Sequence, residues 1–133
     1  MLAVSDAPRR LRLPLARHRL MGADFKRIYR RGRRAKGTLF TAIVLENELG
    51  RARLGLSVAK RHWKRAVDRN RVRRLLREAF RLELANLPAG LDVVLVAHPA
   101  PERPALVTLR AELTALVARA RAKRPRPESE DAP

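Results

Sequence analysis

The sequence predicts a small α/β domain, of the α+β two-layer sandwich type, in which helices pack on a small mixed sheet. Apolar residues recur with the period of a helix in some segments and alternate, or form short continuous runs, in others. Breaks rich in Pro and Gly separate these segments. The predicted order is helix, strand, strand, helix, strand, helix, with room for a further short strand near Arg33. The 133 residues suffice for one such core.

The first helix is expected at about Gly22 to Arg31. Its apolar residues Phe25, Ile28 and Tyr29 fall at i, i+3 and i+4 and therefore share one side. Gly32 follows at a position where helices commonly end. This segment is therefore predicted to be a short helix with one apolar side.

Two strands are expected next, at 38–46 and 51–59. The first is rich in β-branched and aromatic residues, and the second alternates between large apolar residues and small or polar ones. The apolar set is predicted to face the core. The other set leaves either an exposed face without a ligand or room for a ligand to lie on the sheet. The two sets are Leu54, Leu56 and Val58 on one side, and Arg53, Gly55, Ser57 and Ala59 on the other.

The second half of the chain supplies a long helix at 66–84, a strand at 91–98 and a last helix at about 104–121. The strand is almost continuously apolar, so it is predicted to be buried on both faces. Both helices carry an apolar stripe at helical spacing. The stripes are Val72, Leu75, Leu76, Ala79 and Phe80 in the long helix, and Leu106, Leu109, Leu113, Leu116 and Val117 in the last one.

These elements make one domain at 21–121. Residues 1–20 are basic, contain Pro8 and Pro14, and are expected to form a loose N-terminal arm. Residues 122–133 have no apolar pattern and change from basic to acidic, so this tail is expected to be disordered.

The charge of the chain predicts a polyanionic partner. Its net charge is +18, from 31 Lys and Arg against 13 Asp and Glu. Such a field concentrates nucleic acid first and an anionic membrane surface second. Most of the cations are Arg, whose planar guanidinium forks onto phosphate and stacks on bases, and this favours nucleic acid.

Several classes of protein are excluded or disfavoured. The absence of Cys excludes disulfides, thiolate catalysis and Cys-based zinc sites. The N-terminal segment has no uninterrupted apolar stretch of signal-peptide length, and no segment is apolar for long enough to span a membrane. We therefore expect a cytoplasmic protein.

The strongest functional signal is the segment 60–81, which holds ten Lys or Arg against only Asp68 and Glu78. On a helical wheel most of its cations lie opposite the apolar stripe, with Arg73 on the flank. A solvated charged face is the alternative, but such faces usually mix both signs. The pattern therefore predicts contact with RNA or DNA phosphates. The outward cluster comprises Asn70, Arg71, Arg74, Arg77 and Arg81.

Arg69 is an exception, because it falls nearer the apolar side of the wheel. Either the helix begins at about this residue, or the side chain reaches past the sheet edge toward the strip of small residues. Asp68 suits an N-cap or first-turn position, where a carboxylate favours the helix dipole.

The segment SVAKRHWKRAVDRNRVRRLLREAFR resembles the signature of the protein subunit of bacterial ribonuclease P, with its V-[SA]-K-K, R-N-R-x-[KR]-R and R-E-x-F-R elements. ADFKRIYRRG and LDVVLVAH resemble the first helix and the late strand of that family. The resemblance covers about residues 11–120. Arg61 where Lys is common, the bulky Trp63 and the acidic tail depart from the pattern. The matching positions are Val58, Ala59, Lys60, Arg65, Ala66, Arg69, Asn70, Arg71, Arg73, Arg74, Arg77, Glu78, Phe80 and Arg81.

The resemblance implies a fold detail and a function. The basic helix would connect two parallel strands with a left-handed crossover, against the general right-handed rule. The chain would be the non-catalytic protein subunit of an endoribonuclease that removes the 5′ leader from precursor tRNA. The RNA subunit, with its Mg²⁺ ions, would perform the hydrolysis. The expected partners are this catalytic RNA and the leader of precursor tRNA, with no DNA and no membrane.

The resemblance also implies two groups of binding residues. Phe25 and Tyr29 of the leader group can stack on unpaired bases, although core packing is the alternative for Phe25. The RNA-subunit group is Arg65, Arg69, Asn70, Arg71, Arg73, Arg74, Arg77 and Arg81; the leader group, in a cleft floored by the sheet and walled by the first helix, is Phe25, Tyr29, Thr41, Ile43, Ser57, Lys60 and Arg61.

No catalytic residue and no metal ligand is expected in the protein itself. His18, His62 and His98 are scattered, and no two acidic residues form an obvious metal pair by spacing. Trp63 either stacks on RNA or packs at the helix entry. Two other functions remain open, namely a structural rRNA-binding protein and a DNA-binding basic helix. A helix packed on a sheet is poorly placed to enter a major groove, which disfavours DNA.

Overall fold

The computed structural model describes residues 18–99 and 104–124. All the predicted helices and strands are present, including the short strand near Arg33. Most of the expected N-terminal arm and of the expected disordered tail lie outside the described residues. The elements are α3 (Gly22–Arg31), β1 (Arg33–Lys36), β2 (Phe40–Glu46), β3 (Arg53–Ser57), α4 (Ala66–Glu83), the 3₁₀ turn η1 (Leu84–Asn86), β4 (Leu91–Ala97) and α5 (Leu106–Arg121).

The four strands form one mixed sheet in the order β1-β2-β4-β3. β2 pairs antiparallel with β1 and with β4, whereas β3 pairs parallel with β4. The predicted parallel pair joined through the basic helix is therefore confirmed, and the hand of the crossover stays a prediction from the resemblance. β4 is central and mostly buried, as its continuous apolar sequence predicts.

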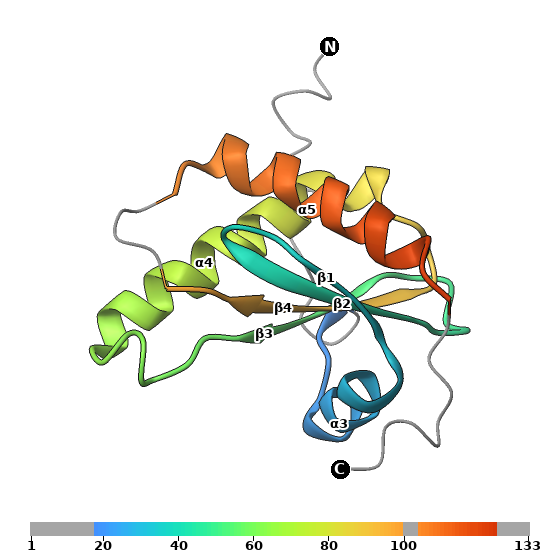
Figure 1. Cartoon of the computed structure of the whole chain (residues 1–133), viewed down its shortest axis with the longest axis horizontal. Coiled ribbons are helices and arrows are strands. Elements are labelled where there is room, and N and C mark those ends of the chain that lie inside the picture. The colour runs from blue at the N-terminus through green and yellow to red at the C-terminus, as the bar shows by residue number, and fades with distance from the viewer. Residues whose placement is uncertain (1–17, 100–103, 125–133) are drawn as a thin grey trace.

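One face of the sheet is covered by α4 and α5, which lie above it in Figure 1. The main core lies between these layers and contains Leu76 and Phe80 of α4 together with Leu113 and Leu116 of α5. Leu54 of β3 is buried on this side, as the alternation of its strand predicts. The two-layer arrangement expected from the sequence is thus formed by the sheet, α4 and α5.

α3 covers part of the opposite face and lies below the sheet in Figure 1. A second, smaller core forms there from Leu20, Ile28, Ile43 and Val94, all almost completely buried. α3 ends where the N–H of Gly32 donates to the carbonyl oxygen of Ile28 at 2.7 Å. Because α3 is short, it covers only part of this sheet face, and Thr41, Ser57 and Val96 beside it are half-buried rather than buried.

α3 is tied to the sheet by a buried carboxylate. Asp92, at the start of β4, is completely buried. It accepts hydrogen bonds from Arg53 at 2.9 Å, from Arg27 of α3 at 3.0 Å and from Asn47 at 2.6 Å. Burial alone would raise the pKa of Asp92, but the hydrogen bonds from Arg53, Asn47 and Arg27 outweigh it and hold the pKa below its usual value. Asp24 of α3 adds a weaker link, 3.5 Å from both arginines.

The packing of α3 also depends on the lack of a side chain in β3. A Cβ atom at Gly55 would lie 2.5 Å from Cζ of Phe25 and 3.1 Å from Cδ1 of Leu20. Phe25 therefore rests directly on the backbone of β3. Part of the predicted small-residue strip is thus filled by α3 itself.

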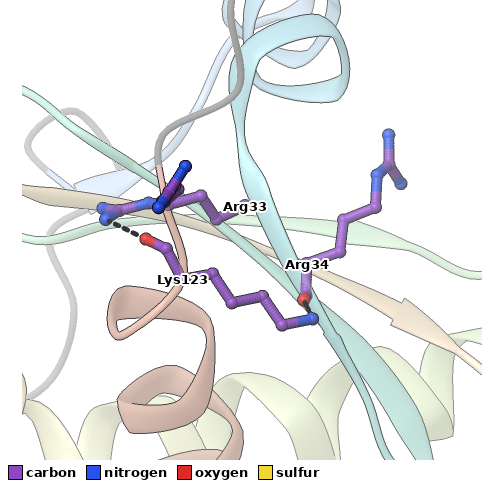
Figure 2. Close-up of a pocket in the computed structure, with 4 residues that line it drawn as sticks. Arg33, Arg34 and Lys123 are labelled. Atoms are coloured by element: carbon purple, nitrogen blue, oxygen red, sulfur yellow. Dashed lines mark hydrogen bonds between the residues drawn. The ribbon is translucent and has the colours of Figure 1, made fainter.

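The β1 edge of the sheet is fastened to the end of α5. The nearly buried Arg33 of β1 donates to the carbonyl oxygens of Arg121 at 3.0 Å and Lys123 at 3.3 Å, and it pairs with Glu46. Lys123 in turn donates to the carbonyl oxygen of Arg34, so the two segments are linked in both directions, as Figure 2 shows. Carbonyl groups at the end of a helix need such partners. The hollow of about 330 Å³ between Arg33, Arg34, Lys123 and Arg124 is thus built around structural contacts.

Replacing Asp92 by Asn is expected to lower the free energy of unfolding by about 3 kcal/mol at neutral pH, because two arginines lose their carboxylate. The folded-state pKa of Asp92 is depressed, so the stability it contributes is complete above its unfolded value of about 4 and is lost as pH falls through the folded value. Urea unfolding of both proteins across this pH range measures the difference. Asp24→Asn, at a more exposed carboxylate, is the control and should cost less. Equal losses would contradict the special role of Asp92.

Replacing Gly55 by Ala is expected to cost about 1–2 kcal/mol of unfolding free energy, because the ring of Phe25 must move off the strand. Gly22→Ala is the matched control, since a Cβ atom there meets nothing within 4 Å. Thermal or urea unfolding compares the two variants. A Gly55→Ala protein as stable as the Gly22→Ala protein would show that α3 is not packed on β3 in this way.

Candidate nucleic-acid interface

The outer side of α4 presents a row of exposed cationic and polar side chains. Its members point away from the side that carries Leu76 and Phe80, and Arg65 at the N-cap position extends the row with 74% of its side chain exposed. The predicted location of the row is therefore found in the structure. We call these residues the α4 row: Arg65, Asn70, Arg71, Arg74 and Arg77.

Only part of the positive charge of the α4 row is balanced within the protein. Asp68, in the first turn as predicted, lies 3.4 Å from Arg65 and 3.6 Å from Arg71. In the portion of the chain that the structure describes, Arg74 and Arg77 have no acidic partner. Like charges at such spacing repel one another, and an external phosphate would remove this cost. Arg74 and Arg77 are therefore the strongest candidates for phosphate contact.

Arg69 does not belong to the α4 row. The helix begins at Ala66, and the guanidinium of Arg69 turns back to donate to the carbonyl oxygens of Trp63 at 2.8 Å and Lys64 at 3.1 Å. Both alternatives considered for this residue are therefore wrong. Its side chain fixes the loop that leads into α4, and Trp63 is partly buried against the main core.

Arg81 also differs from the expectation, whereas Arg73 was expected on the flank of the helix. Arg81 keeps only 12% of its side chain exposed and forms a bidentate pair with Glu78. The hydrogen bond from Arg81 holds the pKa of Glu78 below its usual value. Arg73 is half-buried and donates to the side-chain oxygen of Asn70 at 3.3 Å. Placing Arg81 in the exposed cluster was therefore wrong, because its side chain folds along the helix toward an acid one turn earlier.

The opposite sheet face contains three cross-strand rows of side chains. In antiparallel and parallel pairs alike, residues directly opposite each other share a face. α3 covers the first two rows, while the third consists of half-buried residues beside α3. This third row is the open floor of a candidate cleft. The rows are Leu45, Asp92 and Arg53; Ile43, Val94 and Gly55; and Thr41, Val96 and Ser57.

The wall of this cleft is aromatic. The rings of Phe25 and Tyr29 are stacked, with centroids 6.4 Å apart and an angle of 28° between the planes. The guanidinium of Arg34 lies 5.6 Å from the centre of the Tyr29 ring and donates to the Tyr29 carbonyl oxygen at 2.7 Å. Phe25 is half-buried over Gly55, so the core-packing alternative describes much of its surface. Tyr29 and the exposed edge of Phe25 remain at the wall.

Of the predicted leader group, Ile43 is misplaced. It is completely buried beneath α3, so it supports the floor and has no surface for a ligand. The alternation of β2 places Ile43 on the sheet face that α3 packs against. The sequence does not show how far α3 extends over that face, and therefore does not show that Ile43 is covered. Lys60 and Arg61 are exposed in the loop after β3.

Sequence reasoning missed two residues of the open floor, Val96 and His98. Because β4 is apolar throughout, its sequence does not show which sheet face each residue occupies. The register with β2 and β3 does show this, since Val96 lies opposite Thr41 and Ser57. Nε2 of His98 lies 2.8 Å from the hydroxyl of Thr41, and Nδ1 lies 3.3 Å from the carbonyl oxygen of Thr38. Because a carbonyl only accepts, Nδ1 donates, and in the neutral ring Nε2 accepts from Thr41.

No group of three His, Asp or Glu side chains within residues 18–99 and 104–124 could hold a metal ion. His18 contacts the carbonyl oxygen of Ala52 at 2.6 Å, and His62 lies edge-on to the ring of Trp63. In that same part of the chain, no helix is both long and apolar enough to cross a membrane.

Comparison with known proteins gives one consistent family. A family model described as ribonuclease P matches residues 16–121. The ribonuclease P protein component of Syntrophobacter fumaroxidans is 42% identical over 94 residues, which cover 70% of this chain and 78% of that protein. The component of Proteus mirabilis is 44% identical over 89 residues, covering 67% and 70%.

Solved structures agree with the sequence relatives. The RNase P protein of Staphylococcus aureus has a TM-score of 0.67 at 28% identity, covering 77% of this chain and 94% of that one. The RNase P protein of Thermotoga maritima has a TM-score of 0.65 at 28% identity, covering 80% and 96%. With the family model matched over nearly all of the described fold, this chain belongs to the family of ribonuclease P protein components, RNA-binding proteins of tRNA processing.

Proposed function

We propose that this chain is the non-hydrolytic subunit of a ribonuclease P particle and that it grips RNA on both faces of its sheet. The α4 row binds the catalytic RNA subunit. The open floor beside α3 binds the 5′ leader of precursor tRNA. The observation that supports this most directly is the opposite placement of an exposed arginine row and an open floor with an aromatic wall.

The α4 row suits a structured RNA because its guanidinium groups can bind backbone phosphates whatever the base sequence is. Exposed guanidinium groups along one helix side can follow a phosphate backbone, and each phosphate neutralised releases counterions. The helix is packed on the sheet through Leu76, Ala79 and Phe80, so its outer side is presented as a rigid surface. Rigid presentation lowers the entropy lost on binding.

The open floor suits an unpaired strand. Thr41, Val96 and Ser57 are small or medium-sized and only half-buried, while Tyr29 offers a ring on which a base can stack. Lys60 and Arg61, exposed in the loop after β3, supply cations for the backbone of the strand. Stacking and backbone contacts tolerate any base, as a subunit that serves many precursors requires.

Hydrolysis is assigned to the RNA subunit and its Mg²⁺, which would activate water to leave a 5′-phosphate on the mature tRNA. This assignment follows from the resemblance to the family. The protein's own contribution is to hold the leader and the RNA subunit together, which converts two weak contacts into one effectively intramolecular arrangement. Its cations also neutralise phosphate repulsion between the RNAs. The proposal places this work in the cytoplasm and requires neither DNA nor a membrane.

The proposal is tested by cleavage of precursor tRNA at low Mg²⁺ concentration with the RNA subunit alone, with this protein alone and with both. Release of the 5′ leader by the mixture, at a rate well above that of the RNA alone, is the expected result. A mixture no better than the RNA alone would favour a structural rRNA-binding protein. Cleavage by RNA-free protein would show that the active site lies in the protein.

The double variant Arg74→Ala/Arg77→Ala is expected to weaken binding to the RNA subunit about tenfold or more. It should also flatten the dependence of log affinity on log salt by about 0.7–0.9 per lost phosphate contact. Arg119→Ala/Arg121→Ala, at exposed positions of α5, is the control with the same charge change. An unchanged slope in the α4 variant would remove these two residues from the interface.

Ser57→Leu is expected to fill the open floor and to weaken binding of precursors with long leaders about tenfold, through loss of roughly one stacked base. Leaderless tRNA should bind the holoenzyme as before. Thr108→Leu adds similar bulk at an exposed position of α5 and serves as control. Affinities for both substrates are measured with each reconstituted holoenzyme, and an equal loss for both would place the leader elsewhere.

A further inference from the structure

The segment 26–36, KRIYRRGRRAK, holds seven Lys or Arg and no acid, a higher density of positive charge than α4 has, and its cations differ in their surroundings. Arg27 is bound to Asp92, and Arg33 is bound to Glu46 and the end of α5. Lys26, Arg30 and Arg31 instead are exposed and have no acidic partner in the described ranges. These three residues are called the α3 outer row.

The α3 outer row lies on the side of α3 that faces away from the sheet. Phe25, Ile28 and Tyr29 occupy the inner side, and the helix rotates by about 100° per residue, so the cations fall opposite them. A shallow hollow of about 260 Å³ runs along this outer side, and no acidic residue among those that the structure describes lines it. Its lining residues are Ala23, Lys26, Arg27, Arg30 and Arg31.

The arrangement has an electrostatic cost that the fold does not explain. Lys26 and Arg30, and likewise Arg27 and Arg31, are like charges at i and i+4, which destabilise a helix. The helix dipole favours Arg30 and Arg31 because they lie in the last turn, but it does not favour Lys26. The acid of α3, Asp24, is turned toward Arg27 and Arg53.

We propose that the α3 outer row is a second binding surface for an RNA phosphate backbone, separate from the α4 row and from the open floor beside α3. α3 and α4 lie on opposite faces of the sheet, so the two rows cannot contact one short stretch of RNA. The protein would therefore sit between two RNA segments. This inference rests on the proposed function and adds a third contact to it.

The chemistry of the surface selects its ligand. Two arginines and a lysine along a groove whose described lining residues include no acid fit successive phosphates. A lipid surface would also require an apolar side facing outward, but the apolar side of α3 is packed on the sheet. The phosphates can come from the RNA subunit or from the body of the tRNA, and the binding assay separates these sources.

The test compares Lys26→Gln/Arg30→Gln/Arg31→Gln with Arg119→Gln/Arg121→Gln/Arg124→Gln, a control that removes three positive charges from exposed positions at the end of α5. Salt dependence is measured for three equilibria: protein with the RNA subunit, holoenzyme with leader-bearing precursor, and holoenzyme with leaderless tRNA. The α3 variant is expected to lower the slope of log affinity against log salt by about 2. This loss should occur either in the binding of the protein to the RNA subunit, or to the same extent in the binding of the holoenzyme to leader-bearing precursor and to leaderless tRNA. The first result assigns the surface to the RNA subunit and the second to the tRNA body.

Three results would overturn the inference. The first is a salt slope of the α3 variant that is no lower than the slope of the α5 control. The second is an equal loss of affinity in both variants. The third is a loss of affinity for the leader-bearing precursor alone, which would make the row part of the leader site. Arg74→Ala/Arg77→Ala in the same assays keeps the two proposals apart. If that variant loses RNA-subunit affinity while the α3 variant does not, only the further inference fails. The charge-preserving variant Lys26→Arg/Arg30→Lys/Arg31→Lys, with unchanged unfolding, should retain binding.

Discussion

The buried carboxylate of Asp92 fixes the position of α3, on which the proposed leader site and the α3 outer row both depend. It collects hydrogen bonds from Arg53, from Asn47 and from Arg27 of α3, and so fixes a helix of ten residues across two of the three side-chain rows on its sheet face. The third row stays open because α3 is held at this position. The aromatic wall and the α3 outer row occupy opposite sides of the same helix, so both depend on this attachment.

The acidic residues explain how so basic a chain can fold. Several of them join elements of the fold: Glu83 pairs with Arg110 of α5, Glu46 pairs with Arg33, and Glu112 accepts the backbone N–H of Leu39. Burial would raise the pKa of Glu83, but hydrogen bonds from Arg110 and Asn86 hold it below its usual value. Because these acids join elements of the fold, and Asp68 lies beside Arg65 and Arg71, Arg74 and Arg77 of α4 have no acidic partner within the described ranges. The field that attracts RNA is thus what remains after the fold has used its carboxylates.

Periodicity and apolar runs predicted the described helices α3, α4 and α5 and the strands β2, β3 and β4, because they report which side of a segment is apolar, whereas β1 was expected only as an optional strand and η1 was not predicted. Periodicity could not predict Arg69 and Arg81, since a wheel gives the direction of a Cβ atom but not the course of a long side chain. Ile43 failed for another reason: its exposure depends on how far α3 extends over β2, which is a tertiary property. Val96 and His98 were missed because only the strand register shows their neighbours.

The central position of β4 has a consequence for the synthesis of the chain. β2 and β3 flank β4 but precede it in sequence, so neither can complete its pairing until residue 97 has left the ribosome. Until then both strands have an unpaired edge, and the apolar side of α4 has no finished sheet to cover. Most contacts of the sheet are distant in sequence, which slows folding. The sheet therefore cannot close around β4 before residue 97 is available, however early the flanking strands have been made.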